Sequence, residues 1–146
     1  MADRGEFVSG LSASREYLLS HHPRSERHRC YAPELLGRRV HLCARCSGVY
    51  PGIALGVVAA SLGPSFLASL TLVTFLPMFA LLDWAFSAFT SRRGSNLRRT
   101  GTGAGLGYAY GVGLVMLFVE GHLAVLAVGV AYGTAAFGLL SLERMR

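Results

Sequence analysis

Three cysteines stand where a polar N-terminal segment meets a long apolar stretch. They are Cys30, Cys43 and Cys46, with twelve residues between the first two and two residues between the last two. Two thiolates at the closer spacing can hold one metal ion, and zinc prefers four tetrahedral sulfur or nitrogen ligands. Cys30 would supply a third ligand, and His28 or His41 a fourth. The pattern predicts a zinc site that closes residues 31–42 into a small knuckle.

Two other interpretations of the cysteines stay open. A Cys-x-x-Cys pair at a helix N-terminus favours the thiolate form, and Arg45 between the two thiols adds positive charge, which suits redox chemistry. Four-helix membrane thiol oxidoreductases use such pairs, but they work with quinones and on the non-cytosolic face. The cysteines could also be small residues that pack at a helix start. A structural disulfide is not expected, because the cytosol is reducing.

Asp83 is the only acidic residue inside the second apolar stretch. An ionised group at membrane depth is costly unless it is paired, so a partner is expected. Arg45, Arg92 and Arg98 are the candidates. The alternative is an interfacial aspartate with no structural role.

The polar loop that follows, residues 92–101, reads Arg-Arg-Gly-Ser-Asn-Leu-Arg-Arg-Thr-Gly. Helix N-terminal amides and guanidinium groups both favour phosphate, so a loop of this kind before a helix predicts an anion site. A lipid headgroup or a lipid-phosphate substrate would fit. We predict that Asn96, Arg98 and Arg99 join Arg45 and Asp83 in one polar cluster. A plain topology-setting loop is the simpler alternative.

The composition excludes a soluble domain. The chain has 146 residues, of which 52% are hydrophobic and 15% charged, and its mean hydropathy is +0.43. Runs of about 20 apolar residues cross the ~30 Å hydrocarbon layer. We therefore predict an all-α, four-helix transmembrane bundle and no signal peptide. The helices are expected at 47–62, 65–89, 101–119 and 123–142, within a membrane domain 46–146 that follows a polar, Arg-rich cytosolic N-terminal segment 1–45.

Charge placement predicts the orientation in the membrane. All 14 basic residues are arginine. They lie before the first helix, between the second and third, and after the fourth, whereas the turns near Pro64 and Glu120 have none. The positive-inside rule then places both termini in the cytosol. We expect the protein in the plasma membrane. Anionic lipid headgroups are expected partners, and nucleic acid is not.

Two of the expected helices carry rows of glycine at every fourth position. Small residues at this spacing let helix backbones approach closely. Packing of the two helices within one bundle is the favoured interpretation, and homodimerisation through one row is the alternative. The rows are Gly48, Gly52 and Gly56, and Gly103, Gly107 and Gly111.

The chain resembles the small multi-pass membrane proteins of the domain-of-unknown-function 2085 family. The matching features are the Cys-Ala-Arg-Cys-Ser-Gly-Val-Tyr block at 43–50, Gly56, Asp83, and the Ser-Asn-Leu-Arg-Arg-Thr-Gly block at 95–101. Family members often carry a Cys-His pair ahead of the first block, where this chain has His21 and His22. The resemblance implies a multi-pass membrane protein and no particular activity.

Three functional hypotheses follow. The first is a membrane protein with a zinc-binding Cys/His site and a polar Asp/Asn/Arg cluster at the cytosolic face. The second is a membrane enzyme that acts on a lipid phosphate or a thiol. The third is a structural subunit that packs through its glycine rows, with a second copy or another membrane protein as its partner.

Overall fold

The computed structural model describes residues 24–35, 38–90 and 94–145. The chain divides into two compact units, Met1–Ala44 and Arg45–Arg146. His21, His22 and Arg92 lie outside the described residues.

The described residues of the N-terminal unit form a short 3-10 helix, η1 (Arg24–Arg29), and four two-residue strands. Strand β1 (Cys30–Tyr31) pairs antiparallel with β4 (Leu42–Cys43), and β2 (Glu34–Leu35) pairs antiparallel with β3 (Arg38–Arg39). Residues 31–42 are thus closed by backbone pairing. The strands were not predicted, because two residues are too few to produce a recognisable alternation of polar and apolar side chains.

The described part of the C-terminal unit contains four long apolar helices. They are α2 (Ala44–Leu62, which starts at the last residue of the N-terminal unit), α3 (Leu70–Phe89), α4 (Asn96–Phe118) and α5 (Ala124–Arg144). Each is long and apolar enough to cross a membrane. The protein is therefore an all-α, four-helix membrane protein, and the predicted fold class is confirmed.

Helix capping explains where two helices start. Residues Ser65–Ala68 form a separate 3-10 helix, η2, and α3 begins only after Ser69, whose side chain accepts a hydrogen bond from the Leu72 N–H at 3.4 Å. Helix α4 begins at Asn96, five residues before the expected 101, because Ser95 caps it through the Arg98 N–H at 3.2 Å. A serine N-cap satisfies an amide that the helix leaves unpaired. The polar block therefore forms the first turn of α4.

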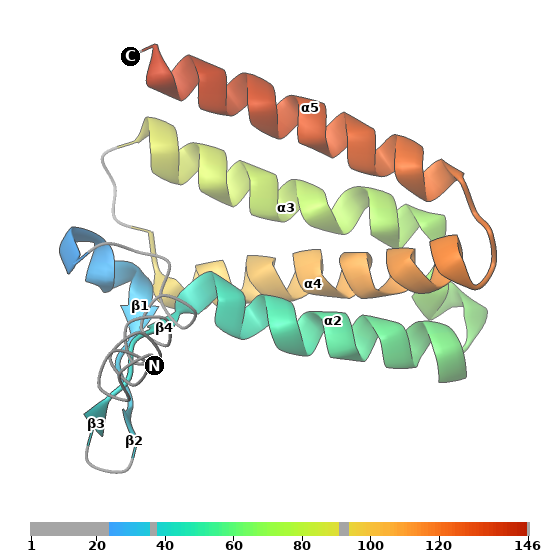
Figure 1. The fold of residues 1–146 in the computed structure, drawn as a ribbon, viewed down its shortest axis with the longest axis horizontal. Helices are drawn as coiled ribbons and strands as arrows, with labels where there is room; N and C mark the ends of the chain where they lie inside the picture. The colour runs from blue at the N-terminus through green and yellow to red at the C-terminus, as the bar shows by residue number, and fades with distance from the viewer. Residues whose placement is uncertain (1–23, 36–37, 91–93, 146) are drawn as a thin grey trace, which may run out of the picture. The chain divides into compact units, whose positions relative to one another are not determined.

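The four helices run alternately up and down. Helix α3 lies between α5 and α4, and α2 lies along the other side of α4 (Figure 1). The start of α2, the end of α3, the start of α4 and the end of α5 all lie at one end of the bundle, which we call the arginine end (left in Figure 1). Arg45, Arg98, Arg99 and Arg144 belong to it.

Helices α2 and α4 are packed through the two glycine rows. A Cβ added at Gly52 would overlap the Ala104 carbonyl oxygen and approach the Tyr108 nitrogen to 3.0 Å. From the opposite side, a Cβ at Gly107 would overlap the Val49 carbonyl oxygen. Gly48, Gly56, Gly103 and Gly111 face backbone atoms of the other helix in the same way. The rows thus face each other within one chain, and only glycine allows this approach.

Tyrosine hydroxyls connect other parts of the bundle. Tyr108 of α4 donates a hydrogen bond to the Leu67 carbonyl oxygen at 2.7 Å. Tyr132 of α5 donates to the Thr74 carbonyl oxygen of α3 at 2.5 Å, in the turn before Pro77. Tyr132 thereby attaches α5, none of whose residues is buried, to α3.

Candidate functional site

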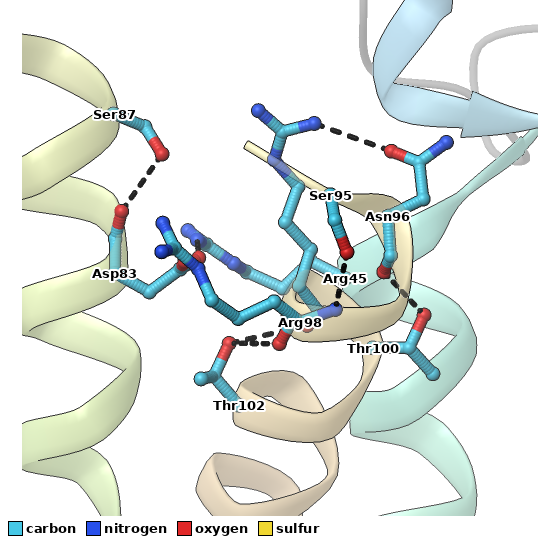
Figure 2. Close-up of polar contacts among 9 residues, drawn as sticks. Arg45, Asp83, Ser87, Ser95, Asn96, Arg98, Thr100 and Thr102 are labelled. Atoms are coloured by element: carbon cyan, nitrogen blue, oxygen red, sulfur yellow. Dashed lines mark hydrogen bonds and ion pairs between the residues drawn. The ribbon is translucent and has the colours of Figure 1, made fainter. Parts of the chain in front are cut away.

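Asp83 is the centre of the polar cluster at the arginine end. Its side chain is only 3% exposed, and each carboxylate oxygen accepts a hydrogen bond from a different arginine. Arg45 Nη2 lies 2.5 Å from Oδ2, and Arg98 Nε lies 2.6 Å from Oδ1. Both guanidinium groups point at Asp83 from neighbouring helices (Figure 2). Two of the three candidate partners of Asp83 are thus in contact with it.

Three helices position this ion-pair triad. Arg45 lies in the first turn of α2, Asp83 in the second-last turn of α3, and Arg98 in the first turn of α4. Glycine makes the approach of α2 possible, since a Cβ at Gly103 would lie 2.5 Å from the Arg45 carbonyl oxygen. The glycine rows therefore position the charged cluster as well as pack the bundle.

The start of α4 is held by its own polar side chains. Arg99 is buried and donates from Nη1 to Asn96 Oδ1 at 3.2 Å, and the Thr100 hydroxyl donates to the Asn96 carbonyl oxygen at 3.0 Å (Figure 2). Asn96 and Arg99 thus form a pair in the first turn of α4, one helical turn from the Arg98–Asp83 contact.

Gly94, just before the cap, leaves space for one added carbon atom beside two guanidinium groups and a hydroxyl. A Cβ added there would lie 3.5 Å from Arg98 Nη2, 3.5 Å from Arg99 Nη2 and 3.6 Å from Ser87 Oγ. Two guanidinium groups and a hydroxyl therefore converge on a backbone without a side chain. Guanidinium groups beside a helix N-terminus are suited to an anion.

Positive charge exceeds negative charge in this cluster. Among the described residues, Arg45 and Arg98 contribute two positive charges to the triad and Asp83 one negative charge, which leaves +1. The Arg98 side chain is 54% exposed and that of Arg45 26% exposed, so both can be reached from outside. Arg45 Nε is buried without a hydrogen-bond partner. The Asp83 carboxylate thus orients the guanidinium groups of Arg45 and Arg98 and neutralises only one of their two charges.

The cysteines are not joined by disulfide bonds. Cys30 and Cys43 are both buried and lie directly opposite each other in the β1–β4 pair. His28 is exposed and His41 half-buried. Among the described residues, no group of three or more His, Cys, Asp or Glu side chains is arranged to hold a metal ion. The zinc site stays a prediction, with the Cys30–Cys43 pair as two of its ligands.

Comparison with known proteins identifies the family. The sequence model of domain of unknown function 2085, described as a predicted membrane protein, matches residues 28–114. The chain belongs to this family. The matched part of this family member includes the three cysteines and the Arg45–Asp83–Arg98 cluster, whereas α5 lies beyond it. No curated protein and no solved structure matches the chain.

Two contributors to the site were not predicted. Ser87 lies four residues after Asp83, where a helix brings its side chain onto the same face, and its hydroxyl donates to the Asp83 carbonyl oxygen at 2.8 Å. This spacing could have revealed it. Gly94 gave no signal of its own, because glycine in a loop is ordinary and its role depends on where Arg98 and Arg99 point.

Proposed function

We propose that this membrane protein binds the phosphate of an anionic lipid headgroup at its arginine end. The observation that carries the proposal is the buried Asp83 carboxylate between two exposed or half-exposed arginines. A carboxylate in this position holds guanidinium groups in fixed orientations, and fixed guanidinium groups bind phosphate with less loss of side-chain entropy.

The donors needed for a phosphate are close to one another. Arg98 uses Nε for Asp83 and directs Nη2 towards the space at Gly94, where Arg99 Nη2 and Ser87 Oγ also converge. The two guanidinium groups suit the acceptor oxygens of one phosphate group, whereas the Ser87 hydroxyl already donates to the Asp83 carbonyl oxygen. Charge-assisted hydrogen bonds contribute about 1.5–3 kcal/mol each, so a few of them account for specific binding.

The distribution of arginines supports a cytosolic position for this site in the plasma membrane. With four membrane-crossing helices, the arginine end and both termini share one side, and arginine-bearing segments are retained in the cytosol. Anionic lipids are abundant in the cytosolic leaflet. The proposed ligand and the proposed site would therefore meet at the same membrane surface.

Binding is better supported than catalysis. A membrane enzyme for a lipid phosphate or a thiol needs a base or a nucleophile beside the ligand. Both oxygens of Asp83 already accept hydrogen bonds from arginines, so the carboxylate serves as a positioning group. The structural-subunit hypothesis is weakened in a different way, because contact between α2 and α4 accounts for both glycine rows.

Zinc binding is a second proposal, supported by the opposed Cys30 and Cys43. Two thiolates on neighbouring strands are close enough to share one metal ion, with Cys46 and a histidine as further ligands. Metal analysis of purified protein tests it. About one zinc per chain, lost in Cys43→Ser, is expected, and metal-free protein with three titratable thiols would exclude it.

Thermal unfolding in a neutral detergent tests headgroup binding. Glycerol 1-phosphate carries the headgroup phosphate without a hydrocarbon chain. At ten times a millimolar dissociation constant it should stabilise the protein by about 1.4 kcal/mol, relative to sodium chloride of the same ionic strength. Arg98→Gln should lose this stabilisation, and Arg144→Gln, which removes an arginine from the end of α5, should retain it. No stabilisation of the wild-type protein would refute the proposal.

A further inference from the structure

An apolar groove lies between α3, α4 and α5, next to the triad. Its volume is about 330 Å³, at the lower end of the range for ligand pockets. Pro77 and Trp84 of α3, Leu106 of α4, and Ala136 and Leu140 of α5 contribute to its walls. Arg45 is the charged residue of the lining.

The groove is suited to a hydrocarbon chain. The Tyr132 ring lines it, but the hydroxyl donates to the Thr74 carbonyl oxygen. The polar atom of this side chain is therefore engaged by the protein, and the remaining lining apart from Arg45 is apolar. Ala80 and Ala136 leave room between α3 and α5, since their side chains are small.

Arg45 connects the groove with the charged cluster. Arg45 is one of the lining residues of the groove, and its Nη2 donates a hydrogen bond to Asp83 Oδ2. A ligand that used both features would have an anionic group at the arginine end and a chain that extends along α3 towards Pro77. Anionic lipids have this distribution of charge and hydrocarbon.

We propose that the groove holds one acyl chain of the anionic lipid whose phosphate is bound at the arginine end through Arg98. This inference rests on the proposed headgroup binding and adds that the ligand is a lipid and not a free phosphate ester. The small volume favours one chain in the groove, with any second chain in the surrounding bilayer. Three of the groove residues, Tyr132, Ala136 and Leu140, lie outside the segment that matches the family.

The protein's single tryptophan allows a direct measurement of acyl-chain binding. Trp84 is the single tryptophan, and it lines the groove. Bromine atoms on an acyl chain quench tryptophan fluorescence on contact. The full-length protein is reconstituted in phosphatidylcholine vesicles. These contain a small fraction of either phosphatidic acid or phosphatidylcholine with brominated acyl chains. We expect brominated phosphatidic acid to reach the same quenching of Trp84 fluorescence at about one-tenth of the mole fraction that brominated phosphatidylcholine requires.

Variants distinguish binding of the acyl chain from binding of the headgroup. Ala136→Phe fills the groove and should abolish the preference for brominated phosphatidic acid, whereas Ala135→Phe, on an exposed position beside it, should keep the preference. Should Ala136→Phe fail to fold, the comparison of the two brominated lipids on the wild-type protein is sufficient, because equal quenching overturns the inference.

The outcomes distinguish the two proposals. Equal quenching by both lipids, together with stabilisation by glycerol 1-phosphate, overturns the groove assignment and leaves headgroup binding intact. Preferential quenching that Arg98→Gln does not reduce contradicts headgroup binding at the triad. Preferential quenching that is lost in both Ala136→Phe and Arg98→Gln, and kept in Ala135→Phe, supports a lipid bound through both parts.

Discussion

Arg98 Nε lies 2.6 Å from Asp83 Oδ1, and this contact joins the start of α4 to the last part of α3. Because Arg45 occupies the other carboxylate oxygen, Asp83 connects three helices at one end of the bundle. The same contact that holds the helices together also orients the guanidinium groups that we assign to phosphate binding. Stability and ligand affinity should therefore respond together when Asp83 is changed.

Asp83→Ala tests the structural role of the carboxylate. Removing it leaves two arginine side chains without their counter-ion, and loss of one partner of a buried ion pair costs about 3 kcal/mol. We expect this decrease in the free energy of unfolding, measured by denaturant titration in mixed micelles. Leu82→Ala, at an exposed neighbouring position, is the control and should lose less than about 1 kcal/mol. Equal losses in the two variants would show that the triad does not hold the helices together.

The glycine rows predict a strongly position-dependent effect of one added methyl group. At Gly107 a Cβ would overlap the Val49 carbonyl oxygen, so Gly107→Ala should destabilise the protein by about 1–3 kcal/mol. At Gly101, on the same helix, there is nothing within 4 Å of the added Cβ. Gly101→Ala should therefore leave stability unchanged or raise it by up to about 1 kcal/mol, because alanine favours the helix. Thermal unfolding measures the stability of both variants. A higher stability of Gly107→Ala than of Gly101→Ala would contradict this interpretation.

Tyr132→Phe should loosen α5. The variant loses the hydrogen bond to the Thr74 carbonyl oxygen and keeps the ring, and such bonds between membrane helices contribute roughly 1 kcal/mol. Limited proteolysis should cut the turn before α5 faster than in the wild-type protein. Tyr110→Phe, which changes an exposed tyrosine of α4, serves as the comparison and should be cut at the wild-type rate. Unchanged proteolysis of Tyr132→Phe would mean that other contacts attach α5.

The orientation in the membrane can be measured by labelling single added cysteines in intact cells. Glu120→Cys lies in the turn between α4 and α5, and Arg144→Cys at the far end of α5. A membrane-impermeant maleimide should label the first in intact cells and the second only after lysis, above the background of the three native cysteines. The opposite pattern would place the arginine end outside the cytosol and would remove the argument from cytosolic anionic lipids.

The membrane helices could be predicted from the sequence because lipid imposes a simple requirement. A chain must offer long apolar runs to cross it, and the described residues of this chain contain four. Capping was harder to predict. Ser95 and Ser69 each start a helix through a single side-chain hydrogen bond, and a serine in a polar loop looks the same whether or not it caps.

The candidate site was only partly predictable. Asp83 inside an apolar run called for a partner, and the arginines nearest the helix ends were the natural candidates. That Arg45 and Arg98 divide its two oxygens between them depends on how closely α2 approaches α4, which the glycine spacing alone did not specify. The groove beside Arg45 was not predictable, since it depends on how far α5 stands from α3, and apolar side chains at such positions are expected in any membrane helix.

The central claim is that Arg98, held by Asp83, recognises an anionic headgroup, and lipid affinity tests it most directly. Native mass spectrometry of the detergent-solubilised full chain gives the dissociation constants of phosphatidic acid and of phosphatidylcholine with the same acyl chains. We predict that the wild-type protein and Arg144→Gln bind phosphatidic acid at least about tenfold more tightly, as one charge-assisted hydrogen bond provides, and that Arg98→Gln loses this preference. Equal affinities for the two lipids in the wild-type protein, or equal losses in Arg98→Gln and Arg144→Gln, would contradict the claim.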